Sequence, residues 1–150
     1  MANPIDILLA KVENFNKSLT DGTYIKEIVQ RYEAEIVDIN SQEQLYDKGI
    51  DSLGRSIASY MPYSPATIKI KQIKNQPYDR VTLRDEGDFY RGFFIKFIDD
   101  GFIIESNDWK EGLLTFYYGW EIFGLTPENK AFVSHEYIYP DLLEIARNTL

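Results

Sequence analysis

Two apolar runs on either side of Asp99-Asp100-Gly101 constrain the fold of this chain more than any other feature of its sequence. The first run, Phe89 to Phe97, and the second, Phe102 to Ser106, have the length of β-strands, and an Asp-Gly turn between such runs is typical of a β-hairpin. Because side chains alternate along a strand, we predict that one face of the first strand packs on a core. That face carries Phe89, Arg91, Phe93, Ile95 and Phe97. The Val-Thr-Leu stretch at 81–83 is also strand-like and lies ahead of an acidic turn at Gly87.

The length and composition indicate one globular domain, residues 1–150. With 44% hydrophobic residues, the chain can bury a core without covalent staples. It contains no cysteine, which excludes a disulfide framework and thiolate chemistry. No apolar stretch approaches the roughly 20 residues that span a bilayer, and the N-terminus lacks the features of a signal peptide. We therefore expect a soluble protein that is not secreted.

The N-terminal part, residues 1–43, is predicted to be helical. Asn3 can cap a helix, and Pro4 suits its first turn. Apolar residues then recur at spacings of three and four, namely Ile5, Leu8, Val12, Phe15 and Leu19. Such a stripe is typical of a helix face that packs on a core. Asp21-Gly22 ends this helix, a second is predicted from Thr23 to about Asn40, and the short glycine turn predicts that the two form an antiparallel helical hairpin.

Between Ser41 and Pro62 the helical periodicity fades, which predicts a small hairpin or an extended loop held to the body by Ile50 and Ile57. Ser64-Pro65 is typical of a helix start, and the proline favours a helix over residues 65–74. The sequence Thr-Ile-Lys-Ile-Lys inside that segment alternates, which leaves a strand open as the alternative.

The last third of the chain is predicted to be helical again. A helix is expected to begin near Trp109, and its inner side carries Leu113, Leu114, Tyr117 and Tyr118. The tail from Pro140 to Leu150 has the pattern of a short helix. The chain as a whole thus predicts an α+β fold. It comprises a helical part (1–43), a core in which the hairpin packs with helices (44–132) and a C-terminal helical tail (133–150).

The sequence contains no residue pattern typical of an enzyme. Its one histidine, His135, lies between a serine and a glutamate, but a catalytic triad needs residues that converge in space, which neighbours rarely do. A single histidine does not make a zinc site. Asp85, Glu86 and Asp88 lack the spacing of a calcium loop, and no phosphate-binding glycine loop is present. We therefore predict no catalytic residue, no cofactor and no metal.

The net charge of −8 is distributed unevenly along the chain, with −5 over residues 1–47, +4 over 48–96 and −7 over 97–150. Opposite potentials steer and register interfaces, and aromatic residues often anchor them. We therefore predict that the middle segment contributes to a contact between copies. The candidate interface residues are Lys69, Lys71, Lys74, Tyr78, Arg80, Arg84, Tyr90 and Trp120. The alternative is three ordinary solvated surfaces.

Three motifs lie between residues 44 and 132. They are Gln44-Leu45-Tyr46-x-Lys48-Gly49-Ile50-Asp51-x-x-Gly54, then Lys71 followed by Gln76-Pro77-x-Asp79-x-Val81-Thr82-Leu83-x-Asp85-x-Gly87-x-Phe89, and Tyr118-Gly119-x-x-Ile122-Phe123-Gly124-Leu125-Thr126. In these motifs the chain resembles small structural proteins of tailed bacteriophages, in particular the tail-completion and virion-morphogenesis proteins. Those proteins sit at the head–tail joint or at the top of the tail.

The resemblance implies a non-enzymatic adaptor that forms a ring with copies of itself and contacts other neck or tail proteins. Such a protein is found in the host cytoplasm during assembly and then in the virion, and it binds no membrane and no specific nucleic acid. The acidic balance also argues against duplex binding, because affinity for DNA depends mostly on neutralising phosphates. Two alternatives stay open: a small acidic intracellular inhibitor that mimics nucleic acid, and a hydrolase that uses carboxylates the sequence does not pair.

Overall fold

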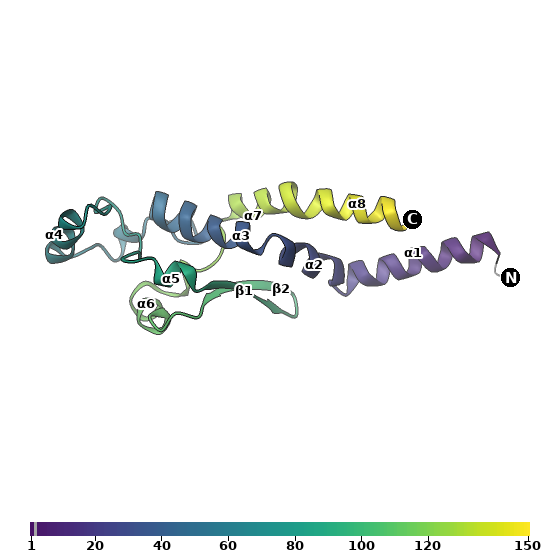
Figure 1. Ribbon diagram of the computed structural model, residues 1–150, viewed down its shortest axis with the longest axis horizontal. Coiled ribbons are helices and arrows are strands. Elements are labelled where there is room, and N and C mark those ends of the chain that lie inside the picture. Colours follow the sequence, from purple (N-terminus) through teal and green to yellow (C-terminus); the bar gives the residue numbers. More distant parts are fainter. Residues whose placement is uncertain (2) are drawn as a thin grey trace.

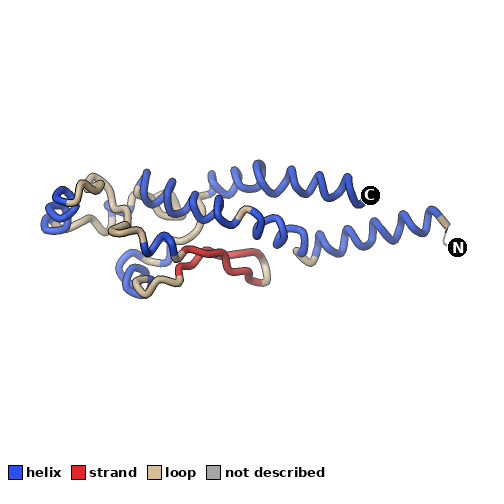
Figure 2. Tube along the Cα trace, viewed as in Figure 1, coloured by secondary structure: helices blue, strands red, loops and turns tan. Residues whose placement is uncertain are grey.

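The computed structural model describes residue 1 and residues 3–150. The molecule is elongated, with helices along its long axis and a two-stranded β-hairpin beside them, as Figures 1 and 2 show. This arrangement confirms the α+β fold class that the sequence predicts.

The predicted hairpin consists of strands β1 (Phe93–Ile98) and β2 (Gly101–Ser106), which pair antiparallel. Phe93 and Ile95 of β1 are buried, and so is Ile104, which lies opposite Ile95 on β2. The predicted core-facing alternation is therefore confirmed at Phe93 and Ile95.

The residues ahead of β1 are helical, so the strand begins later than the sequence predicts. Helix α5 spans Asp88–Arg91, and Gly87 precedes it with a φ of 90°, a left-handed conformation that glycine adopts without strain. Phe89 is buried, whereas Arg91 is exposed. The helical turn brings the rings of Phe89 and Phe93 to a centroid distance of 5.0 Å. A continued strand would separate these residues by about 13 Å.

The stretch Val81–Leu83 is buried but forms no strand. Tyrosine hydroxyls, rather than a neighbouring strand, bond its backbone. The Thr82 N–H donates to the Tyr63 hydroxyl at 3.0 Å, and the Tyr90 hydroxyl donates to the Thr82 carbonyl oxygen. Leu83 has a left-handed φ of 56°, which ends extended geometry at this point.

Four helical segments follow one another at the N-terminus: α1 (Pro4–Thr20), α2 (Thr23–Arg31), α3 (Glu33–Asp38) and the π-helical segment η1 (Ile39–Lys48). The predicted cap is confirmed, because the Asn3 side chain accepts a hydrogen bond from the Ile5 N–H at 3.0 Å. In Figure 1, α2 and α3 continue in the direction of α1. The segments α1 and α2 therefore lie end to end rather than in the predicted antiparallel pair.

The helical run extends to Lys48, although the sequence predicts a loop from Ser41. Polar residues weaken the apolar periodicity here, but two of them, Asn40 and Gln44, are fully buried on the inner face. Gly49 ends the run with a left-handed φ of 62°.

The segment after Gly49 is irregular, as predicted, with an isolated bridge from Ile50 to Ser56 and a short 3₁₀ helix, η2 (Ile57–Ser59). Ile57 is fully buried and holds this segment to the body. The open choice for residues 65–74 is decided in favour of a helix, α4 (Pro65–Ile73). The Ser64 hydroxyl caps it by accepting a hydrogen bond from the N–H of residue 67 at 3.1 Å.

The C-terminal third contains α6 (Glu111–Tyr118), the 3₁₀ helix η3 (Trp120–Ile122), α7 (Pro127–Val133), the π-helical η4 (Ser134–Ile138) and α8 (Tyr139–Thr149). Since α7, η4 and α8 follow without a break, the last helix begins well before residue 140, where the sequence predicts its start.

This last helical run lies beside α2 and α3 and runs in the opposite direction (Figure 1). The rings of Tyr32 and Tyr137 stack at a centroid distance of 4.5 Å, and Arg31 forms a salt bridge with Asp141 at 2.5 Å. The helix that folds back on the N-terminal run is thus the C-terminal one.

The core lies between the helices and the hairpin. Its centre is an aromatic cluster in which Phe93 contacts three rings, those of Phe89, Tyr90 and Phe123, at centroid distances of 5.0, 5.8 and 5.2 Å. Because Phe123 follows η3, this cluster joins the hairpin to the C-terminal third of the chain.

Candidate interaction surface

The residues considered in the sequence as candidates for catalysis or metal binding lie on the surface or in contacts within the chain. His135 lies exposed on η4. In the acidic turn, Asp85 pairs with Lys74 at 2.7 Å and Asp88 pairs with Arg91. Hydrogen bonding to Lys74 lowers the pKa of Asp85, as expected for a carboxylate held in its charged form. Over the described residues, no three His, Cys, Asp or Glu side chains gather where they could hold a metal ion.

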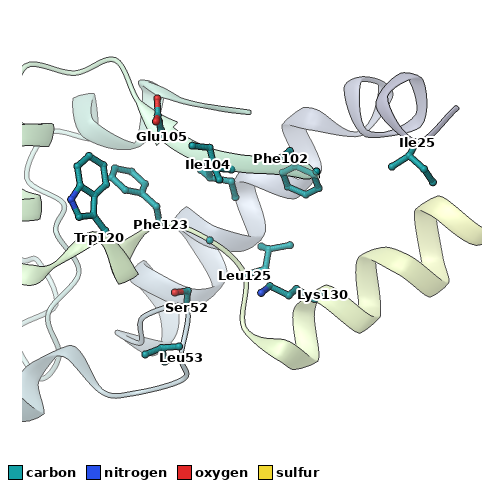
Figure 3. Close-up of a pocket in the computed structure, with 13 residues that line it drawn as sticks. Ile25, Ser52, Leu53, Phe102, Ile104, Glu105, Trp120, Phe123, Leu125 and Lys130 are labelled. Atoms are coloured by element: carbon teal, nitrogen blue, oxygen red, sulfur yellow. The ribbon is translucent and has the colours of Figure 1, made fainter. Parts of the chain in front are cut away.

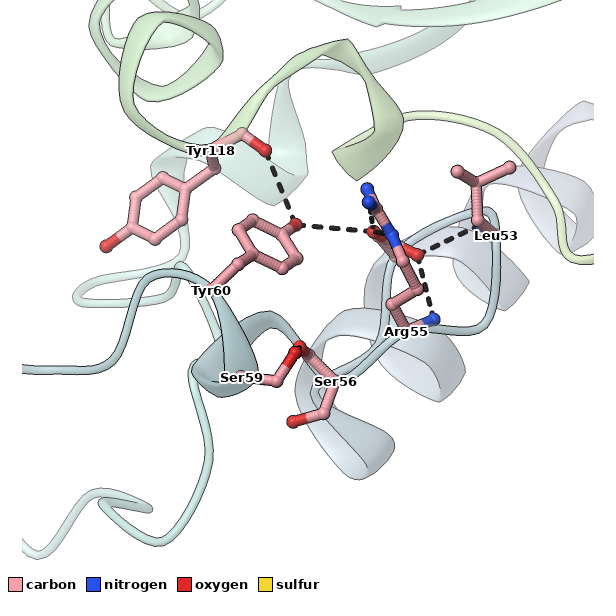
Figure 4. Close-up of polar contacts among 7 residues, drawn as sticks. Leu53, Arg55, Ser56, Ser59, Tyr60 and Tyr118 are labelled. Atoms are coloured by element: carbon pink, nitrogen blue, oxygen red, sulfur yellow. Dashed lines mark hydrogen bonds and ion pairs between the residues drawn. The ribbon is translucent and has the colours of Figure 1, made fainter.

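The most buried carboxylate, Asp51, organises the turn between Ile50 and Ser56 (Figure 4). Its oxygens accept hydrogen bonds from the N–H groups of Leu53 and Arg55 at 3.0 and 2.9 Å. The Arg55 guanidinium pairs with the same carboxylate at 2.8 Å. All of these partners lie within four residues, so Asp51 acts as the structural centre of a turn.

Tyr60 extends this cluster toward α6. Its hydroxyl lies 3.3 Å from the Asp51 carboxylate and 3.3 Å from the carbonyl oxygen of Tyr118. Burial, and then the neighbouring Asp51 carboxylate, raise the pKa of Tyr60 to about 12. The neutral phenol is therefore the form that the fold stabilises.

The raised pKa predicts a loss of stability at high pH. An unfolded tyrosine has a pKa of about 10, so the contribution of Tyr60 is fully present below pH 10 and is lost as the pH rises toward 12. In Tyr60→Phe, the free energy of unfolding should fall less between pH 10 and 12 than in the wild type, as measured by denaturant titration. Tyr139→Phe, at an exposed tyrosine, is the matched control. Identical pH profiles for Tyr60→Phe and the wild type would contradict this prediction.

Two buried polar side chains, Asn40 and Gln44, hold the segment between η3 and α7 in place. The Asn40 side chain donates to the Ile122 carbonyl oxygen at 3.0 Å and accepts from the Gly124 N–H at 2.9 Å. The Gln44 side chain donates to the Gly124 carbonyl oxygen and accepts from the Thr126 N–H, both at 2.9 Å. These bonds position Phe123 in the core and the start of α7 beside the hairpin. The sequence did not predict that Asn40 and Gln44 are buried, because a buried polar side chain and an exposed one have the same local sequence pattern.

Two residues predicted for an interface are buried, which corrects their assignment. Lys71 is 7% exposed, donates a hydrogen bond to the Arg84 carbonyl oxygen and lies over the Tyr63 ring at 5.5 Å. Tyr90 is 8% exposed, and its hydroxyl bonds the backbone of Thr82. Both belong to the framework of this chain and cannot anchor a partner on its surface.

The remaining basic candidates are largely neutralised by contacts within the chain. Lys74 pairs with Asp85, and Arg80 pairs with Asp79 and donates to the Tyr46 carbonyl oxygen. The guanidinium of Arg84 lies 4.8 Å from the centre of the Tyr46 ring. Among the described residues, six of the seven salt bridges use a basic residue of the segment 48–96. Most of the positive charge of the segment 48–96 is therefore paired within the chain.

Four of the predicted interface residues are exposed: Lys69, Lys74, Tyr78 and Trp120. Lys69 lies on α4, and Tyr78 lies in the irregular chain after it. Trp120, which is 61% exposed, is the first residue of η3. Among the described residues, no salt bridge, cation–π contact or ring contact joins any two of these four side chains.

The largest uncovered apolar element is α1, and this corrects the prediction that its stripe packs in a core. None of its residues is buried. Ile5, Leu8, Val12 and Leu19 are 64, 50, 36 and 40% exposed. Figure 1 shows the reason, since α1 projects from the body and extends past the end of α8. We call this helix, Pro4–Thr20, the arm.

A groove of about 540 Å³ lies between β2 and the start of α7 (Figure 3). Its walls are mainly apolar and include Ile25, Leu53, Phe102, Ile104, Phe123 and Leu125. Figure 3 shows Trp120 and Leu53 at one end and Ile25 at the other. Lys130 and Glu105 contribute a charge of each sign to the lining. Contiguous apolar surface of this kind is typical of an interaction site.

Helix α6 exposes a further apolar face. Leu113 and Tyr117, predicted to point inward, are about half exposed, and Phe116 is 81% exposed. Leu114 and Tyr118 pack against the core from this helix, and Thr115 between them is buried. The helix is amphipathic, as predicted, but it is rotated so that much of its apolar surface faces solvent.

No family model, no curated protein and no solved structure matches this chain. In the part of the chain that the structure describes, no helix is both long and apolar enough to cross a membrane.

Proposed function

We propose that this protein is a non-enzymatic structural protein of a tailed bacteriophage virion, and that its copies form a ring at the head–tail joint or at the top of the tail. The observation that carries the proposal is the arm, a 17-residue helix whose apolar stripe is left largely in solvent by its own chain. Exposed apolar surface is costly in water, at about 25 cal/mol per Å², and uncovered stripes of this kind mark surfaces that a partner covers.

The motifs in the middle of the chain also support an assembly role. The motifs at residues 44–54, 76–89 and 118–126 resemble tail-completion and virion-morphogenesis proteins. In the structure, residues of these motifs make contacts within the chain. Asp51 closes a turn, Gln44 fixes the start of α7, and the Tyr46 ring packs against the guanidinium of Arg84. The partners are then other copies of the chain and neighbouring neck or tail proteins, in the host cytoplasm during assembly and in the virion afterwards.

Negative-stain electron microscopy of the purified chain, alone and with neck and tail proteins of the same particle, tests the proposal. We expect closed rings, either free or on the partner that serves as a platform, with a mass that is a whole multiple of 17.5 kDa. A single copy in the assembled particle would contradict the proposal. So would a turnover that disappears on one Asp or Glu substitution while the fold is kept, because that result would indicate a hydrolase.

A further inference from the structure

We infer that the contact between copies is an exchanged arm, in which α1 of one copy lies in the apolar groove beside β2 of the next. This inference rests on the proposed ring and names the surfaces that make it. It replaces the charge-based contact that the sequence predicts, since most of those charges are paired within the chain.

The arm has the form of a helix that docks in a groove. Its apolar residues Ile5, Leu8, Val12, Phe15 and Leu19 follow an alternating spacing of three and four residues, which places them on one narrow stripe. A helix of this length extends about 25 Å. Helix-in-groove recognition uses anchors at such i, i+3, i+4 and i+7 positions.

The receiving groove is longer than the close-up alone indicates. A neighbouring depression of about 510 Å³ lies between the tip of the hairpin and the junction of α1 with α2, and it shares Ile25, Gly101 and Phe102 with the groove. The two depressions are therefore adjacent, and together their lining residues extend from Trp120 and Leu53 along β2 to Thr20.

The junction at residues 20–24 holds the arm away from its own groove. Gly22 adopts a left-handed φ of 80°, and the Asp21 carboxylate accepts hydrogen bonds from the Thr23 N–H and hydroxyl at 2.9 and 2.6 Å. The rings of Phe15 and Tyr24 contact each other across the turn, with centroids 5.4 Å apart. An arm fixed in this extended direction leaves its own groove open to the arm of another copy, as in domain swapping.

The charges are compatible with this occupant. Lys11 and Glu13 flank Val12 in the middle of the arm, and the groove offers Glu105 and Lys130. The whole arm carries two charges of each sign, Asp6, Lys11, Glu13 and Lys17. Since the arm and this groove each have no net charge, no net repulsion opposes the contact. Because the arm and the groove are different surfaces, the contact repeats head to tail and closes into a ring when the rotation between copies divides a full turn.

Two variants, each lacking one half of the contact, test the inference. Leu8→Asp places a charge on the stripe of the arm, and Leu53→Asp places one at the end of the groove; both positions are at least half exposed. Burying an unpaired carboxylate is costly, so each variant alone should associate about tenfold or more weakly than the wild type. Asn14→Asp, off the stripe on the same helix, is the matched control and should assemble as the wild type does. Trp120→Ala is a second groove variant if Leu53→Asp melts below the wild type.

Mixing the two variants decides between contact types. A Leu53→Asp copy keeps its arm, and a Leu8→Asp copy keeps its groove, so the mixture has one intact contact per pair. We expect a heterodimer that grows no further, measured by native mass spectrometry. Wild-type assembly of Leu53→Asp, or a mixture in which both variants stay monomeric, would overturn the inference.

Cysteine pairing identifies the position of the arm, because the chain has no cysteine of its own. Copies with Val12→Cys mixed with copies with Leu53→Cys should form a mixed disulfide dimer under mild oxidation. A double variant that forms the disulfide only within a monomer would show an arm folded onto its own groove and would also overturn the inference.

The failure of this inference and the failure of the proposed function give different results. Rings that persist without the arm contact would contradict the inference and leave the proposed function standing, whereas a single copy in the assembled particle would contradict both.

Discussion

Phe93→Ala is expected to lower the free energy of unfolding by about 3–5 kcal/mol, the range for truncating a buried aromatic residue. Phe93 is 8% exposed, and its ring contacts those of Phe89, Tyr90 and Phe123. These partners come from α5 and from the chain after η3, so the cavity would open where the hairpin meets the rest of the core. The surrounding elements are joined by hydrogen bonds, which limits how far they can collapse into that space.

Phe116→Ala is the matched control, because it removes the same ring from a position that is 81% exposed on α6. Its effect on the free energy of unfolding should stay within about 0.5 kcal/mol. Chemical denaturation of both variants, with the denaturant dependence fitted separately, measures the difference. Equal midpoints for the two variants would show that the packing of β1 differs from the one described.

Gln44→Leu is expected to destabilise the fold by about 3 kcal/mol or more, because it leaves several buried polar groups without partners at about 1–3 kcal/mol each. Gln44 is fully buried, and leucine fills a similar volume. The substitution removes the acceptor of the Thr126 N–H at 2.9 Å and of the Asn129 side-chain amide at 2.8 Å. It also removes the donor to the Gly124 carbonyl oxygen.

The same substitution two residues earlier, Gln42→Leu, is the control. Gln42 lies on the same helical run and is exposed, so its replacement should change the free energy of unfolding by less than about 0.5 kcal/mol. Thermal unfolding of the two variants compares them directly. If Gln44→Leu and Gln42→Leu unfold at the same temperature, the buried network does not hold the start of α7.

Local signals in the sequence determined where several elements begin and turn. Asn3-Pro4 and Ser64-Pro65 mark the starts of α1 and α4, and both caps are made in the structure. Thr126-Pro127 carries the same signal for α7, where the Thr126 hydroxyl accepts from the Asn129 N–H at 3.2 Å, although the sequence prediction did not use it. The Asp-Gly turn likewise sets the hairpin. These features are readable because capping and turn formation involve only residues within a few positions of one another.

Burial, in contrast, was decided by the tertiary structure. The spacing of apolar residues shows which face of α1 is apolar, but whether that face is covered depends on elements far away in the sequence. α8 contacts α1, but it ends before the N-terminal end of the arm (Figure 1). Lys71 and Tyr90 look like surface residues in sequence, yet their polar atoms meet the backbone of Arg84 and Thr82.

The same physical reason applies to the segments whose conformation the sequence predicted wrongly. Phe89 turns into a helix because that conformation brings its ring onto Phe93, and Val81–Leu83 leaves the strand geometry because tyrosine hydroxyls satisfy its backbone. In η1, Asn40 and Gln44 form hydrogen bonds with partners 80 or more residues away. Long-range contacts of this kind outweigh local propensity, which is a difference of about 1 kcal/mol per residue or less. Local chemistry thus determined the elements, and only the packing of distant residues decided which surfaces the chain buries and which it leaves for a partner.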